Sequence, residues 1–294
     1  MNLTEGFGLD TITLAGPLEA RLAAMRGAGF EQVMLSARDL VAHEGGVAAA
    51  VRAVKASGLR PTGFQVLRDF EGLSGHLHAY KVDVAKAMLE MCAQLDCKVL
   101  LACSSASPHA SQEPEHLARD LRKLAMLAVP LGIRIAYEGL SWGRTINEYT
   151  TAWDIVCHAD CSNLGLALDS FHMLAAKTPL EAIDEIDAER IFLVQLSDFL
   201  WDETPTFADR MNTARTYRVF PGEGVHTEQV AEIAQRLQRI GYRGDYSFEV
   251  FNDDYQQLPA EVVAARGRAS ALWLREDVLR RPVPLPAVPS RAGA

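Results

Sequence analysis

Four oxygen-bearing side chains stand at the ends of short apolar runs, and their types point to metal chemistry. They are Glu138 in IRIAYEG, Asp169 in LGLALDS, Gln195 in IFLVQLSD and Glu249 in YSFEVFND. A buried, unpaired carboxylate is energetically costly, and three that converge also repel one another. A hard divalent cation removes both costs, because such ions prefer oxygen ligands. The four residues therefore predict a site for one divalent metal ion, with Mg, Mn or Co better suited than Zn to an all-oxygen set.

The elements that must position these residues follow from an alternation of short apolar runs with longer Ala- and Leu-rich amphipathic stretches. Candidate strands cover residues 7–14, 31–37, 60–67, 98–104, 133–139, 164–170, 191–197 and 246–251. Candidate helices lie near 17–28, 46–57, 79–96, 114–131, 147–158, 179–187, 227–240 and 259–277. Alternating strands and helices form parallel βαβ units, and eight such units predict an α/β fold, the (β/α)8 TIM barrel.

Barrels of this type gather their catalytic groups at the carboxyl ends of the strands. The four residues fall on the fifth to eighth candidate strands, so they are expected around one mouth. Residues 198–226, between the last two strands, are polar and long enough to predict a functional loop. We expect residues 1–278 to form the catalytic barrel domain and the Pro-rich residues 279–294 to form a disordered tail.

Composition narrows the classes of partner. The chain has 294 residues with 49% hydrophobic content, enough for a large core, and a net charge of −9. That charge argues against nucleic-acid binding and membrane-surface binding, which need a basic face. The start has no signal-peptide pattern, no apolar run reaches transmembrane length, and the cysteines lack zinc-type spacing. These features predict a cytoplasmic protein, and self-association into a homo-oligomer is left open.

Longer strings around the four residues carry a family resemblance. They are RDFEGL (68–73), YEGLSWGRTINEY (137–149), LDSFHMLA (168–175), VQLSD (194–198), RVFPGEG (218–224) and GYRGDYSFEVFND (241–253). With these strings the chain resembles the bacterial 3-dehydroshikimate dehydratases, members of the xylose-isomerase-like superfamily of sugar-phosphate isomerases and epimerases. The resemblance runs from about residue 7 to about residue 277. It implies a xylose-isomerase-like barrel.

The resemblance also implies a reaction and roles for particular residues. One divalent metal ion would be held by the residues that match Glu138, Asp169, Gln195 and Glu249. A histidine matching His172 would be the catalytic base, and an arginine matching Arg218 would bind the substrate. The substrate would be a small anionic carbocycle, 3-dehydroshikimate, which is dehydrated to protocatechuate in quinate and shikimate catabolism. The chain departs from the family at Ala214, where a serine is common, and at Gly139, where an alanine is common.

The residues themselves suit that chemistry. Loss of water from a hydroxyketone begins with removal of a proton next to the ketone, and a metal ion can stabilise the enolate that forms. His172 has a near-neutral imidazole and can accept that proton, with Glu138 as the second catalytic group. Either Arg218 or Arg68 could bind the substrate carboxylate in a bidentate pair. Alternatively, Arg218 fixes a loop and Arg68 forms an ion pair with an acidic neighbour, Asp69 or Glu71.

Three other functions suit parts of the sequence. A ketose 3-epimerase or hydroxypyruvate-type isomerase on the same barrel would use Glu138 and Glu249 as acid and base. A three-metal endonuclease-like barrel would need more strand-end histidines and a basic face. A non-catalytic sugar-binding barrel would not need the full ligand set. The strings around His172 and Arg218 favour the dehydratase.

Overall fold

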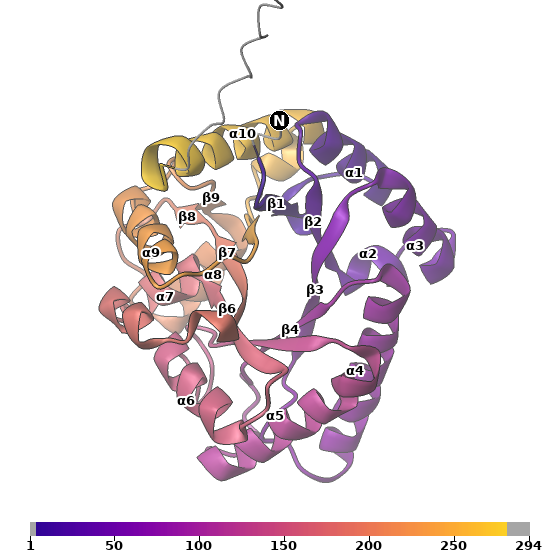
Figure 1. Cartoon of the computed structure of the whole chain (residues 1–294), viewed down its shortest axis with the longest axis vertical. Helices are drawn as coiled ribbons and strands as arrows, with labels where there is room; N and C mark the ends of the chain where they lie inside the picture. Colours follow the sequence, from indigo (N-terminus) through magenta and orange to yellow (C-terminus); the bar gives the residue numbers. More distant parts are fainter. Residues whose placement is uncertain (1–3, 281–294) are drawn as a thin grey trace, which may run out of the picture.

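The computed structural model describes residues 4–280, so residues 281–294 of the expected tail lie outside the described part. Eight parallel strands close a barrel in the order β1-β10-β7-β6-β5-β4-β3-β2 (Figure 1). The strands are β1 Phe7–Asp10, β2 Gln32–Ser36, β3 Arg60–Arg68, β4 Val99–Cys103, β5 Arg134–Glu138, β6 Leu164–Asp169, β7 Ile191–Leu196 and β10 Tyr246–Phe248. Each overlaps a strand expected from the sequence, which confirms the predicted TIM barrel.

Helices form the outer ring, and the last of them, α10, packs beside α1 to close it (Figure 1). The main helices are α1 Leu18–Gly27, α3 Gly46–Ser57, α4 Gly75–Leu95, α5 Pro114–Ala128, α6 Tyr149–Ala159, α9 Thr227–Arg239 and α10 Ala260–Trp273. Two glycines, Gly58 and Gly132, end helical segments with φ values of 69° and 63°. Glycine has no Cβ to oppose this left-handed conformation, which is why it stops a helix. No helix within residues 4–280 has the length and apolarity to cross a membrane.

The connection after β6 differs from the prediction. The helix expected near 179–187 is present as a 3-10 helix, Leu180–Glu185, rather than as an α-helix of the outer ring. The buried residues there are spaced by three, at Leu180, Ile183 and Ile186, which suits a 3-10 helix better than an α-helix. The α-helical turn comes earlier, as α7 (Ser170–Ala175), directly after the strand. It is too short to show helical periodicity in the sequence.

The long segment after β7 also differs, since much of residues 198–226 is regular. Strand β8 (Asp198–Phe199) pairs antiparallel with β9 (Arg218–Val219), and α8 (Phe207–Thr216) lies between them. The helix begins with a capping box in which the side chains of Thr206 and Asp209 each bind the other's backbone N–H. That pairing stabilises the first turn of a helix whose polar sequence reads as a loop.

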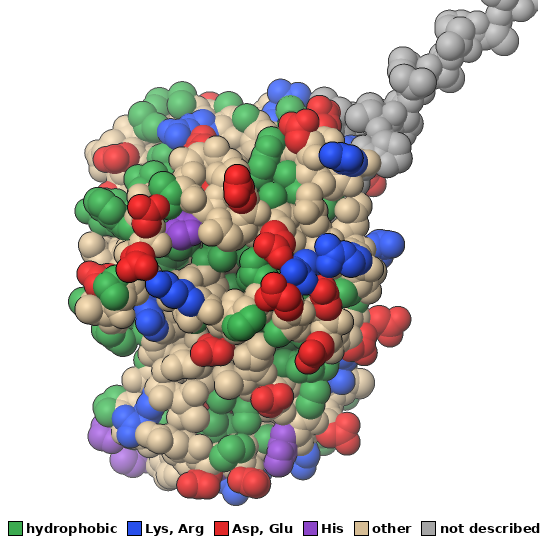
Figure 2. Space-filling view, turned by 90° about the vertical axis from the view of Figure 1, so that its left-hand side faces the viewer, with side chains coloured by type: hydrophobic (Ala, Val, Ile, Leu, Met, Phe, Trp, Pro, Cys, Tyr) green, Lys and Arg blue, Asp and Glu red, His purple; other side chains and the backbone are tan. Residues whose placement is uncertain are grey.

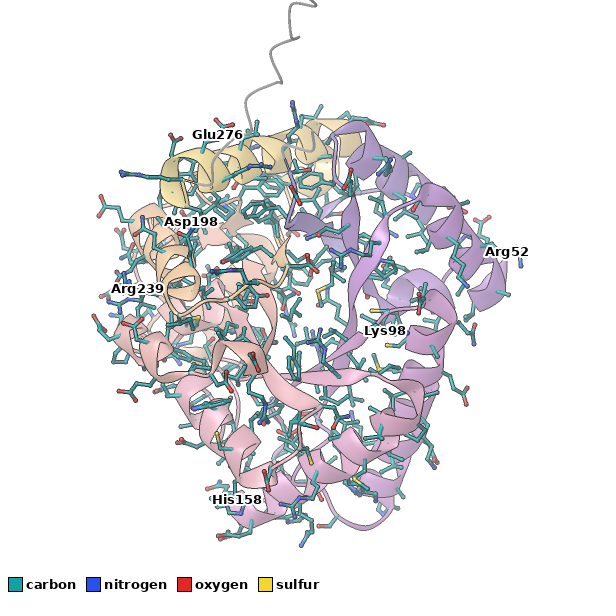
Figure 3. All side chains as sticks on the ribbon, in the orientation of Figure 1. Arg52, Lys98, His158, Asp198, Arg239 and Glu276 are labelled. Carbon is teal, nitrogen blue, oxygen red and sulfur yellow. The ribbon has the colours of Figure 1, made fainter. Side chains whose placement is uncertain are left out.

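The barrel interior is filled below the mouth. On β5, Ile135 and Tyr137 pack outward against the helices, while Ala136 faces inward and Glu138 follows it on the same face. Ala167 and Leu193 take the equivalent inward places on β6 and β7. Side chains occupy the space that the ribbon leaves open, as Figure 3 shows. The polar residues at the strand ends therefore lie directly above a layer of apolar side chains inside the barrel.

The outer surface is mixed in charge. Acidic, basic and apolar side chains are interspersed over the face shown in Figure 2, without a continuous basic field on that face. Charged residues such as Arg52 and Arg239 extend from the outside of the helix ring in Figure 3.

Candidate active site

The four residues predicted as metal ligands lie at the ends of four strands that are neighbours in the barrel. The order β10-β7-β6-β5 places the ends of these strands side by side. Across the sheet Gln195 is in register with Asp169 on one side and with Ser247 on the other. Glu249 follows directly after β10, two residues beyond Ser247, so it continues the same inward face one level higher.

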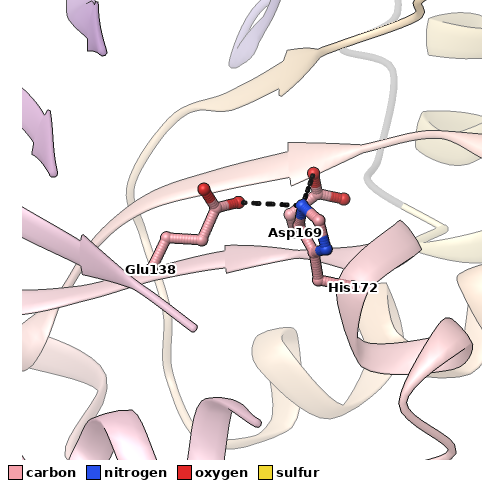
Figure 4. Close-up of side chains that lie close together, drawn as sticks. All are labelled: Glu138, Asp169 and His172. Atoms are coloured by element: carbon pink, nitrogen blue, oxygen red, sulfur yellow. Dashed lines mark ion pairs between the residues drawn. The ribbon is translucent and has the colours of Figure 1, made fainter. Parts of the chain in front are cut away.

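Three of the titratable groups converge in a buried cluster. Atoms of Glu138, Asp169 and His172 lie within 4.8 Å of one another (Figure 4). Asp169 caps α7, because its Oδ1 accepts a hydrogen bond of 2.7 Å from the backbone N–H of Phe171. Three residues later on that helix, His172 turns its Nε2 to within 3.9 Å of Asp169 Oδ2 and 4.0 Å of Glu138 Oε1. Strand end and helix start thus form one unit.

Arg218 joins this cluster to Glu249. Its Nη1 donates to Asp169 Oδ2 at 2.7 Å and to Glu249 Oε2 at 3.1 Å, and its Nε donates to the Ala214 carbonyl at 3.0 Å. The guanidinium is almost fully buried and lies 4.5 Å from the ring of Phe171. Among the described residues, no hydrogen bond uses its Nη2, so this nitrogen remains available for a ligand.

Gln195 and Glu138 each leave one buried oxygen without a partner. Among residues 4–280, no hydrogen bond reaches Gln195 Oε1 or Glu138 Oε1. Their other polar atoms are held: Gln195 Nε2 donates to Asp10 Oδ2 at 3.0 Å, and the Cys103 thiol donates to Glu138 Oε2 at 2.8 Å. Buried polar atoms nearly always find partners, so two orphan oxygens beside a carboxylate cluster fit a cation.

The charge balance of the site supports the same conclusion. Burial, followed by the negative charges of Asp169 and Glu249, raises the pKa of Glu138 to about 8. Burial and the charge of Asp169 raise the pKa of Glu249 to about 7 even though Arg218 acts in the opposite direction. Burial would also raise the pKa of Asp169, but the charges of Arg218 and His172 hold it below its ordinary value. With all three carboxyl groups ionised, the site would carry more negative charge than Arg218 neutralises, and a cation would offset the excess.

His172 is buried, and its imidazole is fixed by hydrogen bonds on one side and by aromatic rings on the other. Its Nδ1 accepts a hydrogen bond from the backbone N–H of Ser141 at 3.1 Å and lies 3.0 Å from the hydroxyl oxygen of the same residue. The rings of Trp142 and Phe171 meet the imidazole edge-on, with centroids 4.7 Å and 5.3 Å away. Burial lowers the pKa of His172 to about 3, well below the near-neutral value expected from the sequence, so the imidazole is neutral at neutral pH.

Arg68 lies at the rim rather than inside the cluster. Its side chain is exposed, and its positive charge acts on His172 and Glu249. Among the described residues it makes no ion pair, and its two acidic neighbours have other partners. Asp69 binds Ser105 and the backbone of Ala106, and Glu71 accepts from Ser105 and Tyr137. The alternative of an ion pair with either neighbour is therefore not observed.

Three residues of the site were not predicted from the sequence: Asp10, Cys103 and Ser141. Asp10 ends β1 after an apolar run, the same signal that identified the ligands, but TITL follows it and the expected strand ran on to residue 14. Cys103 ends β4, and Ser141 follows β5 within one of the family strings. Neither residue type is specific enough to be singled out without its partner.

The two residues that depart from the family pattern, Ala214 and Gly139, are both accommodated by the structure. Ala214 is buried in an apolar cluster with Phe171, Ala175 and Phe199, and it offers Arg218 its carbonyl. A Cβ at Gly139 would lie 2.6 Å from the carbonyl oxygen of Glu148, so an alanine there would force that backbone away. Both residues fit the packing around them.

The chain is similar to a family of known proteins and to several of their members. Residues 22–276 match the family model described as xylose isomerase-like TIM barrel. The chain is 37% identical to a 3-dehydroshikimate dehydratase of Pseudomonas aeruginosa, over 95% of this chain and 44% of that protein. It is 28% identical to an inosose isomerase of Bacillus licheniformis, over 69% of this chain and 72% of that protein. The chain thus spans less than half the length of the dehydratase.

Solved structures agree on the fold. A fusion of a xylose isomerase-like TIM barrel with 4-hydroxyphenylpyruvate dioxygenase superposes with a TM-score of 0.86 at 34% identity, over 93% of this chain and 43% of that one. The IolI protein, solved with a bound zinc atom, superposes with a TM-score of 0.79 at 22% identity, over 93% of this chain and 99% of that one. The second likeness shows the fold alone.

Proposed function

Because the chain belongs to the xylose isomerase-like TIM-barrel family, we propose that it is a lyase that dehydrates 3-dehydroshikimate to protocatechuate with one divalent cation. The observation that carries this proposal is the cluster of Glu138, Asp169 and His172 with unpartnered buried oxygens beside it. The relatives named 3-dehydroshikimate dehydratase in Pseudomonas aeruginosa and Pseudomonas putida support the choice of reaction.

Glu138, Asp169, Gln195 and Glu249 would hold the cation. When bound, it supplies positive charge that stabilises an enolate oxygen. Mg, Mn and Co suit the four oxygen ligands. Since the IolI structure holds zinc, zinc belongs in the same comparison of ions.

His172 is the proposed base. A neutral imidazole has one free nitrogen, and Nε2 must be that nitrogen to take the proton next to the ketone. In the observed geometry Nδ1 accepts from the Ser141 backbone N–H, so the hydrogen lies on Nε2. To act as the base, the ring takes the other tautomer: Nδ1 gives up that bond, carries the hydrogen and donates it to the Ser141 hydroxyl, 3.0 Å away. The electron pair of the broken C–H bond passes to the ketone oxygen and then expels the hydroxyl group. Protonated at Nε2, His172 returns the proton to that hydroxyl, which leaves as water, and Glu138 Oε1 at 4.0 Å stabilises the imidazolium.

The substrate carboxylate has two candidate partners at different depths. Arg68 is exposed at the rim without an ion pair in the described part of the chain, so it can form a bidentate pair at little desolvation cost. Arg218 lies deeper and offers only Nη2, because its other nitrogens already bind Asp169, Glu249 and Ala214. We propose that Arg68 binds the carboxylate and that Arg218 contacts the ring substituents nearest the cation site.

The test is direct. Protein stripped with a chelator is given Mg, Mn, Co or Zn and then 3-dehydroshikimate, and the ultraviolet absorbance of the catechol product is followed. We expect one of these ions to restore turnover, and we expect His172→Ala to lower kcat by about 10²–10⁴-fold without loss of bound metal. Absence of product with every ion would refute the proposal, and full activity of the His172 variant would refute the role of the base.

A second function has a specific observation in its favour. Glu138 and Glu249 both have raised pKa values, as an acid–base pair for moving a proton between carbons needs. The inosose isomerase of Bacillus licheniformis is also similar over most of both chains. An isomerase or ketose 3-epimerase would exchange substrate hydrogen with solvent deuterium and release no catechol. That result with an inosose or a ketose, but not with 3-dehydroshikimate, would reverse the assignment.

A further inference from the structure

Asp10 is a buried carboxylate beside the site that the proposed reaction does not use. It ends β1, on the far side of β10 from the strands that carry Asp169 and Gln195, and it is fully buried. Three hydrogen bonds converge on it. Its Oδ2 accepts from Gln65 Nε2 at 3.1 Å and from Gln195 Nε2 at 3.0 Å, and its Oδ1 accepts from the Ser247 hydroxyl.

The bond to Gln195 has a consequence for the other end of the amide. A glutamine side chain presents donors at Nε2 and an acceptor at Oε1. Burial and the charge of Glu249 raise the pKa of Asp10, but a proton on its Oδ1 can be donated to the Ser247 hydroxyl, so Oδ2 is an acceptor in either protonation state. Asp10 therefore selects the Nε2 end, and Oε1 must face the opposite way. Oε1 is one of the two buried side-chain oxygens at the site that lack a partner among residues 4–280. A reversed amide would turn N–H groups toward a cation and an oxygen toward Asp10, and both contacts are repulsive.

We infer that Asp10 is a positioning residue that orients the Gln195 amide and makes residue 195 an amide ligand rather than a carboxylate ligand. The inference rests on the cation site of the proposed function. A glutamate at position 195 would turn an acceptor oxygen toward Asp10 Oδ2 at hydrogen-bond distance, whereas the amide satisfies both Asp10 and the cation. Partners of metal ligands commonly fix ligand orientation in this way, and their loss weakens metal binding.

Gln65 provides an internal control, because it donates to the same oxygen of Asp10 but is not a candidate ligand. Replacing it by methionine removes the hydrogen bond at nearly constant volume. If Asp10 acts only by packing or by general stability, Gln65→Met and the loss of Asp10 should affect metal binding in proportion to their effects on unfolding. If Asp10 acts through Gln195, only changes at residues 10 and 195 should alter metal affinity.

The experiment is a double-mutant cycle on Mn²⁺ affinity, measured by titration calorimetry on chelator-treated protein. Asp10→Leu removes the acceptor and should weaken binding by about 10–100-fold. Asp10→Asn keeps an oxygen for the two amides and turns its NH₂ toward the Ser247 hydroxyl, so it should weaken binding much less than Asp10→Leu. Gln195→Glu alone should also weaken binding, because the new carboxylate opposes Asp10. Gln65→Met should leave affinity close to that of the unmodified protein.

The double variant Asp10→Asn with Gln195→Glu is the decisive member. With its amide turned the other way, the introduced asparagine can donate one N–H to the introduced glutamate and the other to Gln65 Oε1 once that amide also turns over. The second oxygen of the glutamate is left for the cation, so Mn²⁺ affinity should recover relative to Gln195→Glu. A merely structural role of Asp10 would make the two losses additive. Additive losses, or an Asp10→Leu variant with undiminished affinity, would overturn the inference.

A second readout separates this inference from the cation site itself. In the presence of chelator, Gln195→Glu should lower the unfolding temperature more when Asp10 is intact than in the Asp10→Asn background, because only the aspartate opposes the new carboxylate. This coupling needs no metal. If the unmodified protein bound no divalent cation, the proposed cation site would be refuted, but the metal-free measurements would still test whether Asp10 pairs with residue 195. Equal destabilisation of both backgrounds by Gln195→Glu would overturn the inferred pairing.

Discussion

The two ring nitrogens of His172 meet different surroundings, and the difference controls its acid–base role. The backbone N–H of Ser141 can only donate to Nδ1, which favours a hydrogen on Nε2. The Ser141 hydroxyl can accept from Nδ1, which permits the tautomer with a free Nε2. The two groups of Ser141 therefore favour different tautomers. The tautomer that can act as a base loses the bond from the backbone N–H and depends on the hydroxyl as its acceptor.

Replacing Ser141 by alanine should lower kcat by about two- to tenfold, which corresponds to one neutral hydrogen bond of about 0.5–1.5 kcal/mol. The backbone N–H remains and holds Nδ1 as an acceptor, so Nε2 keeps its hydrogen. Bound metal and the unfolding temperature should change little. Ser57→Ala on α3 is the matched control, since that hydroxyl binds only backbone groups of Val54 and Leu59. Unchanged turnover in the Ser141 variant would contradict this account of the tautomers.

The carboxylates of the site make the stability of the metal-free protein depend on pH. Glu138 and Glu249 retain their protons in the folded state up to their raised pKa values of about 8 and about 7, while the unfolded chain loses them near the ordinary value of 4.5. The folded state then binds more protons, so stability falls as pH rises through this range. His172 acts in the opposite sense, but only below its ordinary pKa of 6.5. Above 6.5 the carboxylates alone set the direction at this site.

We therefore expect the unfolding temperature of chelator-treated protein to fall between about pH 6.5 and about pH 8. Glu138→Gln should reduce the slope, because the amide does not titrate. The slope should not vanish, since Glu249 and the buried Glu71, each with a pKa raised to about 7, remain. Thermal unfolding followed by circular dichroism measures this. An identical slope in the variant would show that Glu138 does not titrate as described.

Among the elements, the segment from β8 to β9 depends on one buried carboxylate. Asp198 begins β8, and its oxygens accept from the backbone N–H groups of Phe199, Gly224 and His226 and from the Thr227 hydroxyl. It thereby ties both ends of residues 198–226 together. Arg218 on β9 is carried by this segment into the cluster, so the positioning of its guanidinium depends on Asp198.

Asp198→Ala should destabilise the protein by about 3 kcal/mol, because it leaves buried N–H groups unsatisfied. It should also speed proteolytic cleavage within residues 198–226 and lower kcat/KM as Arg218 loses its fixed position. Asp202→Ala, an exposed change in the same segment, is the control and should have none of these effects. Limited proteolysis with mass spectrometry measures the cleavage. Cleavage at the rate of the unmodified protein would show that Asp198 does not hold the segment.

The sequence predicted those elements whose hydrophobic pattern is long enough to be periodic. All eight barrel strands were found, and with them Glu138, Asp169, Gln195 and Glu249 at their ends. Helices α7 and α8 were missed because each depends on a cap, Asp169 in the first and Thr206 with Asp209 in the second. A cap acts through a few local bonds and leaves little trace in periodicity.

What the sequence could not predict of the site is the pairing between distant strands. Asp10 lies 185 positions from Gln195, and their bond exists only because β1, β10 and β7 are neighbours in the closed barrel. Cys103 meets Glu138 through the register of β4 with β5. Such partners follow from barrel closure and strand register, which are properties of the folded structure rather than of local sequence.

For the whole molecule, the proposed metal site joins strands from both halves of the chain. Asp10, Glu138, Asp169, Gln195 and Glu249 meet only in the folded barrel, so a cation held there binds the folded state and not the unfolded chain. At an ion concentration of about 100 times the Kd, such binding adds about 2.7 kcal/mol of stability. We expect metal return to raise the unfolding temperature of the stripped protein, and Glu138→Gln to reduce that rise. An equal rise in both would place the ion elsewhere.

This 294-residue chain spans less than half the length of its Pseudomonas dehydratase relatives, and we propose that it catalyses the dehydration with the residues described above. The most direct measurement is the release of catechol product from 3-dehydroshikimate by the isolated chain, before chelation, after chelation and after return of a single divalent ion. The account predicts turnover that chelation abolishes and the ion restores. Turnover that persists in the stripped protein, or none under any of these conditions, would contradict it.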